Sequence, residues 1–345
     1  MLTLRDCCLT AAALLAGWPC LGPPARAADA RHFPDDTELV VAVNVRQVLG
    51  SEPVRREKEA LDHVKSLLDR FVSEHPAMKC LKEAGVDVSH DLSRITFAGP
   101  RGKGLKAGFL ILEGDFSARR LDAALAGVAR GSTEKLKVTR SGAAMLYEIT
   151  APSGGRYYAT LVNTSALVVG TTRAAATDAL ARANGLKKSG LSKELTALLG
   201  TATGEPSIHF AATGPALAHL LEGAAVPNAS AAVAALKAID GLSGAVTLAA
   251  PVRFQLGIFA RDDETAKRLA GAGNSAALNL LALVRQQARK DDRLLPVVEV
   301  VQSLRVTTAG PTILLRSEAS LDAVEKLMSG LPLGRPGVGR AAPGR

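Results

Sequence analysis

The sequence predicts an α+β protein made of two related halves, each a mainly antiparallel sheet with helices packed on one face. Two observations lead to this prediction. A short apolar strand followed by a polar cap and a helix occurs over residues 39–49 and again over 207–221. Hairpins that feed amphipathic helices also recur, around Phe109 and Phe254. Strands joined by hairpins pair antiparallel, and the helices that follow them cover a face of the sheet.

The N-terminal segment, 1–27, is expected to be a secretory signal peptide. Arg5 gives it a basic start, residues 9–21 are rich in Ala and Leu, and Ala25-Arg26-Ala27 is a cleavage sequence of the A-x-A type. A membrane anchor would need about 20 apolar residues, whereas this run has about a dozen and is broken by prolines. A lipidated Cys20 is the other reading, but Trp18-Pro19 is a poor lead-in to it.

Composition narrows the classes of function. Removal of the leader leaves Cys80 as the only cysteine, so an intramolecular disulfide is not possible and stability must come from an apolar core. The formal charge of +9 is spread along the chain, aromatic residues make up only 3%, and the one tryptophan lies in the leader. Nucleic-acid binding would need a concentrated basic stripe with stacking platforms, so we expect no nucleic-acid role.

The first half is predicted over 28–190. Its opening strand, 39–43, leads through Asn44 to an amphipathic helix over 54–71, whose apolar residues recur at spacings of three and four. A hairpin over 94–99 and 107–113 then feeds a helix that runs from a Gly114–Ser117 cap to about residue 128. The remaining predicted elements are strands at 136–140, 144–150, 157–163 and 166–170 and a helix at 174–183.

A linker over 191–205 leads to the second half, 206–330. Thr213-Gly214-Pro215 caps a short helix after the strand at 207–212, and a helix is predicted over 230–239. A long helix begins at Asp262 and runs to about residue 287, with a weak point at Gly271–Gly273. The other predicted elements are strands at 244–249, 253–260, 305–308 and 312–317 and helical segments at 294–304 and 320–328. The tail, 331–345, is rich in Pro, Gly and Arg and is expected to be disordered.

The similar patterns of 108–126 and 254–270, each an apolar strand, an acidic cap and an amphipathic helix, favour a divergent internal duplication. Chance recurrence of a common unit is the alternative.

No motif in the sequence identifies a catalytic or metal-binding site, so we expect no cofactor and no metal, and any catalytic residues are unknown. The histidines lack ligand spacing, and Cys80 has no second cysteine beside it. His209 and His219 are ten residues apart, on a predicted strand and the next helix, so they could meet in space and serve a hydrolase; the alternative, which the sequence favours, is an ordinary structural role for each. Residues 241–245, G-L-S-G-A, resemble a nucleophile elbow without its final glycine and are interpreted as a turn.

Other polar residues have simpler interpretations. The basic, glycine-rich segment 99–104 joins two strands, so it is a hairpin loop and not a phosphate loop. The acidic pairs Asp35-Asp36, Asp262-Asp263 and Asp291-Asp292 fit turns and helix caps. Glu113, at the end of an apolar strand, is the one acid in an unexpected place, and His90-Asp91 fits a capping turn.

The segment 33–49, F-P-D-D-T-E-L-V-V-A-V-N-V-R-Q-V-L, resembles the start of uncharacterised secreted proteins of planctomycete-type bacteria, and Gly114-Asp115-Phe116 fits their later strand-cap-helix units. The resemblance covers about the first 130 residues, and that family has no known activity to carry over.

The sequence therefore favours an exported, periplasmic or extracellular protein that acts as a non-catalytic binding or scaffold module. Envelope proteins and apolar ligands are the candidate partners, and no membrane span is expected after signal cleavage. Two alternatives stay open. One is a hydrolase whose site forms only in three dimensions, and the other is a carrier of lipid or another apolar ligand.

Overall fold

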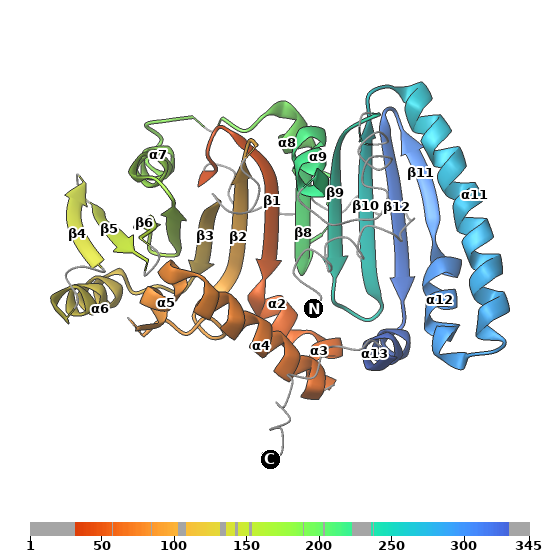
Figure 1. The fold of residues 1–345 in the computed structure, drawn as a ribbon, viewed down its shortest axis with the longest axis horizontal. Coiled ribbons are helices and arrows are strands. Elements are labelled where there is room, and N and C mark those ends of the chain that lie inside the picture. Colours follow the sequence, from red (N-terminus) through yellow and green to blue (C-terminus); the bar gives the residue numbers. More distant parts are fainter. Residues whose placement is uncertain are drawn as a thin grey trace, which may run out of the picture.

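The computed structural model describes residues 32–56, 58–83, 85–102, 108–131, 136–141, 144–151, 154–188, 190–202, 204–222, 236 and 238–330. They form an α+β protein in which one twelve-stranded antiparallel sheet is accompanied by helices (Figure 1). The predicted fold class is confirmed. The predicted signal peptide, 1–27, and the tail, 331–345, lie outside the described residues.

The first half contains seven of the strands. Its elements are β1 (Thr37–Asn44), α2 (Val45–Gly50), α3 (Glu52–Arg56), α4 (Lys58–Glu74), α5 (Pro76–Glu83), β2 (Leu92–Pro100), β3 (Phe109–Gly114), α6 (Ala118–Gly131), β4 (Leu136–Ser141), β5 (Ala144–Thr150), β6 (Arg156–Asn163), β7 (Ala166–Gly170) and α7 (Arg173–Ala183). The predicted helix over 54–71 corresponds to α3 and α4. Asn44 caps α2 as predicted, because its side chain accepts a hydrogen bond from the backbone N–H of Gln47 at 3.0 Å.

The second half contributes the other five strands. The connection between the halves holds α8 (Lys193–Leu199). The elements of the second half are β8 (Ile208–Thr213), α9 (Gly214–Glu222), β9 (Ile239–Thr247), β10 (Val252–Ala260), α11 (Asp263–Ala288), the 3₁₀ turn η3 (Asp292–Leu294), α12 (Leu295–Ser303), β11 (Arg305–Ala309), β12 (Thr312–Ala319) and α13 (Leu321–Gly330). The long helix passes through Gly271 and Gly273 without a break. The helix predicted over 230–239 lies largely outside the described residues, and its last position, Ile239, begins β9.

One continuous sheet joins the two halves. Its strand order is β11-β12-β10-β9-β8-β1-β2-β3-β7-β6-β5-β4, and every neighbouring pair is antiparallel. The halves meet where β1 pairs with β8, with Val41 opposite Phe210. We call this pair of strands the seam. Outward from it, one side runs β1-β2-β3-β7-β6-β5-β4 and the other runs β8-β9-β10-β12-β11.

Helices lie against both faces of the sheet, so the prediction of one covered face is wrong in this respect. On β3, Leu110 and Leu112 pack with α4, α5 and α6, whereas Phe109 and Ile111 pack with α7 and α8. All four of these residues are buried. A strand that is apolar on both sides needs cover on both sides, which explains the uninterrupted run F-L-I-L. We call the side that α7 and α8 cover the α8 face.

In the second half, α11, α12 and α13 pack on the side opposite the α8 face. Two smaller apolar clusters hold them there, one built around Ala266 and Ile313 and the other around Val300 and Ala323. Figure 1 shows α11 standing along one end of the molecule, beyond the edge strand β11. Each fully buried large apolar side chain in these clusters and in the first half contributes about 1.5–3 kcal/mol.

The segment 241–245 lies inside β9, so its interpretation as a turn is wrong. Two of its residues are glycines because neighbouring groups approach closely. A Cβ atom on Gly241 would lie 2.8 Å from the carbonyl oxygen of Ala212, and one on Gly244 would overlap the ring of Phe210. The two glycines that suggested a turn are therefore required by close packing between neighbouring strands.

Within the described parts of the chain, no helix combines the length and the apolar character that a membrane span requires.

Candidate functional site: a cleft at the seam

A cavity with a volume of about 690 Å³ lies at one end of the seam. We call it the seam cleft. Segments from both halves and from the connection between them line it: the turn before β1, the start of β1, the residue after β2, the start of α8, the start of α9, the start of β9, and the residue after β10. The cleft exists only because β1 and β8 are neighbours in the sheet.

The charged residues of the seam cleft are mostly acidic. Five carboxylates line it against two guanidinium groups: Asp35, Asp36, Glu38, Glu194 and Asp240, with Arg101 and Arg261. Three of the acids have cationic partners, and Asp36 and Glu194 have no ion pair within the described residues. The lining therefore carries an excess of negative charge.

The entry to β1 is held by local contacts. Thr37 donates from both its backbone N–H (3.2 Å) and its hydroxyl (2.7 Å) to the carbonyl oxygen of Pro34, which closes a turn around Asp35 and Asp36. Glu38 follows with a side chain only 9% exposed, and its Oε1 accepts a hydrogen bond from Nε of Arg101 at 2.8 Å. This pair ties the end of β2 to the start of β1 beside the cleft.

The α8 side of the cleft has an ordinary helix cap. The Ser192 hydroxyl accepts a hydrogen bond from the backbone N–H of Leu195 at 3.1 Å. Hydrogen bonds from the backbone N–H of Glu194 and the Ser192 hydroxyl lower the pKa of Glu194. Glu194 therefore stays ionised at neutral pH while it faces the cleft.

The α9 side is set by close packing. Gly214 begins α9, and a Cβ atom there would lie 2.8 Å from the carbonyl oxygen of Ile239. The preceding Thr213 is 8% exposed, and its hydroxyl has no hydrogen-bond partner among the described residues. The predicted cap Thr213-Gly214-Pro215 thus starts the helix, with glycine required by the approach of β9.

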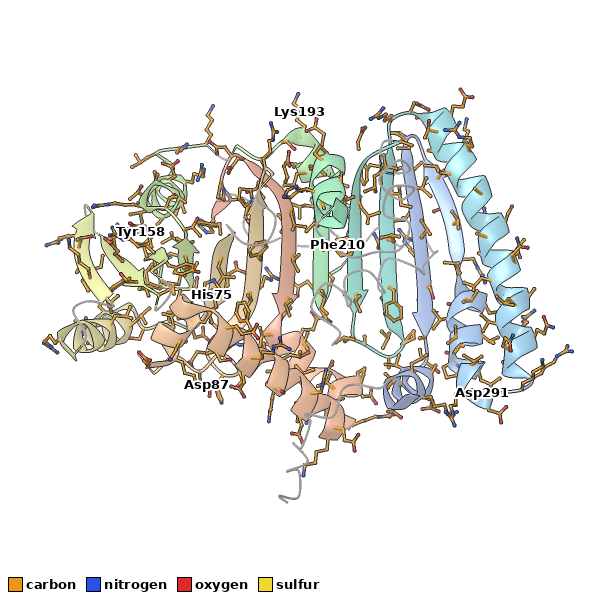
Figure 2. The ribbon with its side chains drawn as sticks, viewed as in Figure 1. His75, Asp87, Tyr158, Lys193, Phe210 and Asp291 are labelled. Atoms are coloured by element: carbon orange, nitrogen blue, oxygen red, sulfur yellow. The ribbon has the colours of Figure 1, made fainter. Side chains whose placement is uncertain are left out.

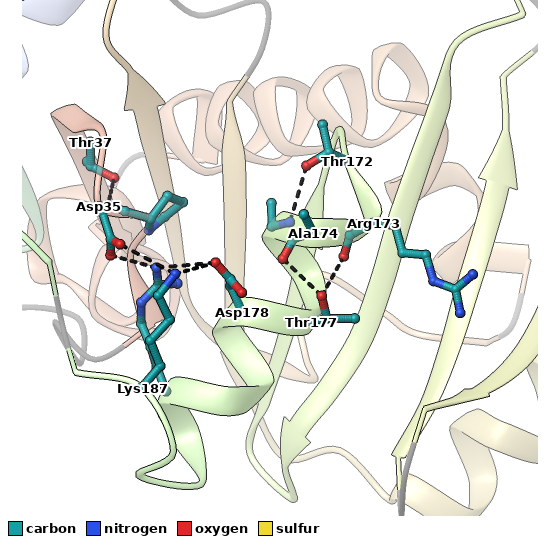
Figure 3. Close-up of polar contacts among 11 residues, drawn as sticks. Asp35, Thr37, Thr172, Arg173, Ala174, Thr177, Asp178 and Lys187 are labelled. Atoms are coloured by element: carbon teal, nitrogen blue, oxygen red, sulfur yellow. Dashed lines mark hydrogen bonds and ion pairs between the residues drawn. The ribbon is translucent and has the colours of Figure 1, made fainter.

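A second, smaller cavity of about 300 Å³ shares Asp35 and Asp36 with the seam cleft and follows one side of α7. Arg182 lies at its end with a side chain only 2% exposed, and donates from Nη2 to Oδ1 of Asp35 at 2.6 Å. Lys187 pairs with Asp178 and lies 3.4 Å from Oδ2 of Asp35 (Figure 3). This four-residue ion cluster fastens the turn before β1 to α7.

The cluster perturbs the acid at its centre. Burial alone would raise the pKa of Asp35, but the hydrogen bond and charge of Arg182, together with Lys187, hold that pKa below its ordinary value. The hydrogen bond to Asp178 is the main reason that the pKa of Lys187 is raised. Asp35 is therefore an ion-pair residue, and its interpretation as a simple turn or cap residue is incomplete. Asp262 and Asp291 do cap helices as predicted.

The structure does not bring His209 and His219 into either cavity. His209 is 5% exposed on the α8 face, whereas its neighbour Phe210 points to the other face of β8 (Figure 2). Burial, aided by the charge of Arg94, lowers the pKa of His209 to about 4. His219 lies on the exposed side of α9. The pair considered for a hydrolase is therefore split between a neutral, buried imidazole and a surface residue.

The other residues considered from sequence have structural surroundings. The Ser243 hydroxyl is 2.6 Å from that of Thr201, and Ser243 is 2% exposed, so it is not a presented nucleophile. Glu113 pairs with Arg94 at 3.3 Å, which accounts for an acid at a strand end. Cys80 lies in α5, and its side chain is outside the described ones.

Asp91 accepts a hydrogen bond from the backbone N–H of Asp87 at 2.8 Å, in the capping turn predicted at His90-Asp91. The basic segment 99–104 begins with the last two residues of β2, and 103–107 lie outside the described residues. No three His, Cys, Asp or Glu side chains gather as possible metal ligands in the part of the chain that the structure describes.

Comparison with known proteins assigns no family to this chain. No family model matches the chain, and no curated protein matches it. Among solved structures, crystal forms III, I and IV of TP0453 are similar, each with a TM-score of 0.44. Their sequence identities are 9%, 11% and 9%, and they cover 88–89% of this chain and 97–99% of that chain.

Proposed function

We propose that this protein is an exported, non-catalytic binding module of the periplasm or cell envelope, and that it holds a ligand bearing a cationic group in the seam cleft. The observation that carries the proposal is the lining of that cleft. Asp36 and Glu194 face a cavity of about 690 Å³, and neither has an ion-pair partner among the described residues.

A cationic group fits this lining for an electrostatic reason. Two carboxylates that share a partly enclosed space repel each other, and an amine or guanidinium between them replaces repulsion with two attractions. The paired residues Glu38 with Arg101 and Asp240 with Arg261 fix the walls on either side. The volume lies within the range of small-molecule sites.

The two alternative functions receive less support from the described residues. The hydrolase considered from the sequence would need its histidine pair or a presented serine in the cleft, and none of His209, His219 and Ser243 lines it. A lipid carrier would need an apolar cavity, and the seam cleft is lined by seven charged residues. Turnover of a hydrolase substrate panel, lost on substitution of one cleft residue, would favour the enzyme over the binding module.

The binding proposal is tested by isothermal titration calorimetry at low and at physiological salt. The probes are arginine, spermidine and a short lysine-rich peptide, with glutamate as the anionic comparison. Cationic probes are expected to bind, and added salt is expected to weaken them because the attraction is screened over about 10 Å at 0.1 M. Binding of glutamate as tight as that of arginine, or no binding of any cationic probe, refutes the proposal.

Variants locate the site. Asp36→Asn combined with Glu194→Gln is expected to weaken cationic binding at least about tenfold, because both unpaired charges are removed. Asp62→Asn is the matched control, since Asp62 is an exposed acid of α4 far from the cleft lining. Equal losses in the control and the cleft variant would show that only net charge matters.

Export and ancestry complete the proposal. The exported protein begins near Ala28, and N-terminal sequencing of the secreted product tests this. The first five strands outward from the seam follow a matching order on each side, and the first half adds β5 and β4 beyond them. This matching order supports an internal duplication, with β1 corresponding to β8 and β2 to β9. The resemblance of residues 33–49 to secreted planctomycete-type proteins is part of the same proposal, and a sequence alignment of close relatives would test both points.

A further inference from the structure

Thr213 stands where a helix cap is expected, but it does not cap the helix. It directly precedes α9, and a threonine there normally accepts a hydrogen bond from the backbone N–H of the second or third helical residue. Thr172 does this before α7, where its hydroxyl accepts from the N–H of Ala175 at 3.2 Å. The hydroxyl of Thr213 has no hydrogen-bond partner among the described residues, although the residue is only 8% exposed.

A buried hydroxyl without a partner lowers the stability of a fold, because it gives up its hydrogen bonds to water and gains none in return. Such groups are uncommon in native proteins, so each one calls for a physical reason. Thr213 is one of the residues that line the seam cleft. A ligand held in that cleft therefore supplies the partner that the described part of the fold does not.

Glu38 lies opposite Thr213 across the seam. The two residues directly follow the last pair of β1 with β8, which is Leu39 with Ala212, and both line the cleft. Residues that are opposite each other on antiparallel strands point to the same face of the sheet, with Cβ atoms about 4.5–5.5 Å apart. This spacing suits a single nitrogen atom that bonds both side chains, one from each half of the protein.

Both side chains are able to accept hydrogen bonds from a cation. The carboxylate of Glu38 uses Oε1 to accept from Arg101 at 2.8 Å, and its Oε2 has no hydrogen-bond partner among the described residues. The hydroxyl of Thr213 offers its lone pairs in the same way. The two guanidinium groups of the cleft each face an acid, since Arg101 pairs with Glu38 and Arg261 lies 4.0 Å from Asp240. Neither of them leaves the surroundings of Thr213 with an excess of positive charge.

The lining of the cleft also indicates which kind of cation fits. None of the described residues that line it is Phe, Tyr or Trp. A quaternary ammonium has no N–H bond to donate, and proteins recognise it by surrounding it with aromatic faces. A cleft lined by carboxylates and a hydroxyl, without aromatic rings among its described residues, suits an ammonium that still carries N–H bonds.

We propose that the cation bound in the seam cleft is a protonated amine that keeps its N–H bonds, and that it donates to the hydroxyl of Thr213 and to Oε2 of Glu38. This inference rests on the function proposed above and adds to it a class of ligand and a residue that sets selectivity. Asp36 and Glu194 attract any cation to the cleft. Thr213 distinguishes among cations of equal charge by the N–H bonds that they carry.

Titration calorimetry with two probes of equal charge tests the inference. The probes are Nα-acetyl-lysine amide and the same compound with three methyl groups on Nε, which keep the positive charge and remove every N–H bond from the cation. The unmethylated probe is expected to bind at least about tenfold more tightly, because methylation removes hydrogen bonds made by a charged group. Equal affinities overturn the inference and leave a cleft that selects charge alone. Binding of neither probe also overturns it, and the arginine and spermidine titrations then decide the proposed function separately.

Substitutions at Thr213 assign the selectivity to its hydroxyl. Thr213→Val is expected to weaken binding of the unmethylated probe at least about tenfold and to leave the trimethylated probe unchanged. Thr213→Ser keeps a hydroxyl and is expected to keep the preference for the unmethylated probe. Thr172→Val is the matched control, because Thr172 does not line the seam cleft, and it should change neither affinity. If Thr213→Val weakens both probes equally, or neither, the inference is overturned.

Thermal unfolding without ligand separates a binding role of Thr213 from a structural one. Thr172→Val should lower the midpoint of unfolding, because a helix cap is lost. Thr213→Val should leave the midpoint unchanged or raise it, because the hydroxyl that it removes has no partner among the described residues. A fall as large as that of Thr172→Val would show that Thr213 caps α9 in solution, and it would overturn the inference.

Discussion

The buried, neutral imidazole of His209 predicts a specific dependence of stability on pH. Its pKa is lowered from 6.5 to about 4 because burial and the charge of Arg94 disfavour the protonated form. In the unfolded chain the imidazole takes up a proton near pH 6.5, so between that pH and about pH 4 the unfolded state binds more protons than the folded state. The contribution of the neutral His209 to the free energy of unfolding is therefore complete above pH 6.5, and the free energy of unfolding falls as the pH drops toward 4.

The size of the effect follows from that pKa. One pKa unit corresponds to about 1.4 kcal/mol, so the fall from 6.5 to about 4 corresponds to about 3 kcal/mol at the acid end. His209→Leu removes the titrating group and a buried Nε2 that has no hydrogen-bond partner among the described residues. At pH 7 the variant is expected to be at least as stable as the wild type, and its advantage should grow by about 3 kcal/mol by pH 4.

The assay is urea unfolding of both proteins at several values between pH 7.5 and pH 4, with the free energy extrapolated to water. The lowered pKa of His75, which is caused by its burial, affects both proteins alike and cancels in the difference. Thr96→Val is the control, because it removes another buried, unpartnered polar atom from the same row of the sheet without removing a titrating group. Its profile should run parallel to that of the wild type. If the His209→Leu profile is also parallel, the reasoning is refuted.

Substitutions at three further positions test the seam and the sheet, each by urea unfolding. Asp35→Asn should cost about 2 kcal/mol at pH 7, since the buried Arg182 loses its hydrogen-bonded carboxylate and keeps only the more distant Asp178 at 3.8 Å. The cost should vanish as the pH falls below about 3.8, because the pKa of Asp35 is lowered from that value in the folded protein. A cost independent of pH would argue against the ion cluster. Gly241→Ala should cost about 1–3 kcal/mol through overlap with Leu198 and the backbone of β8, and a neutral outcome would mean that the strands part easily. Asn44→Ala should cost about 1 kcal/mol through loss of the α2 cap, while Asn44→Asp should cost little.

Local structure was predictable because its causes are local. The strands at 144–150 and 166–170 have the predicted bounds, since alternating or continuous apolar runs end at turn residues on each side. The capping roles of Asn44 and Asp262 are equally local, because each side chain bonds a backbone N–H three residues ahead. Helices and strands of this chain could therefore be read from periods and caps.

The seam cleft could not be predicted in the same way. Of its two unpaired acids, Asp36 precedes β1 and Glu194 lies in the connection that leads to β8, and both line one cleft where β1 pairs with β8. The contact between Asp35 and Arg182 spans 147 residues. Neither the helical period nor the strand alternation specifies which two strands become neighbours, so no local pattern marks these residues as a group. One feature of the sequence could have predicted helices on both faces of the sheet, namely the fully apolar run of β3.

The position of β1 also has a consequence for the nascent chain. Each of the first seven strands finds its hydrogen-bonding neighbours within the first half, with one exception. One edge of β1 pairs with β8, which is made later. While residues beyond about 190 are still being made, the chain can hold a finished half-sheet whose free border is the run L-V-V-A-V. An unpaired apolar border is a template for intermolecular strand pairing. Synthesis that stalls between α7 and β8 is therefore expected to yield aggregates, whereas truncation after β8 protects that border.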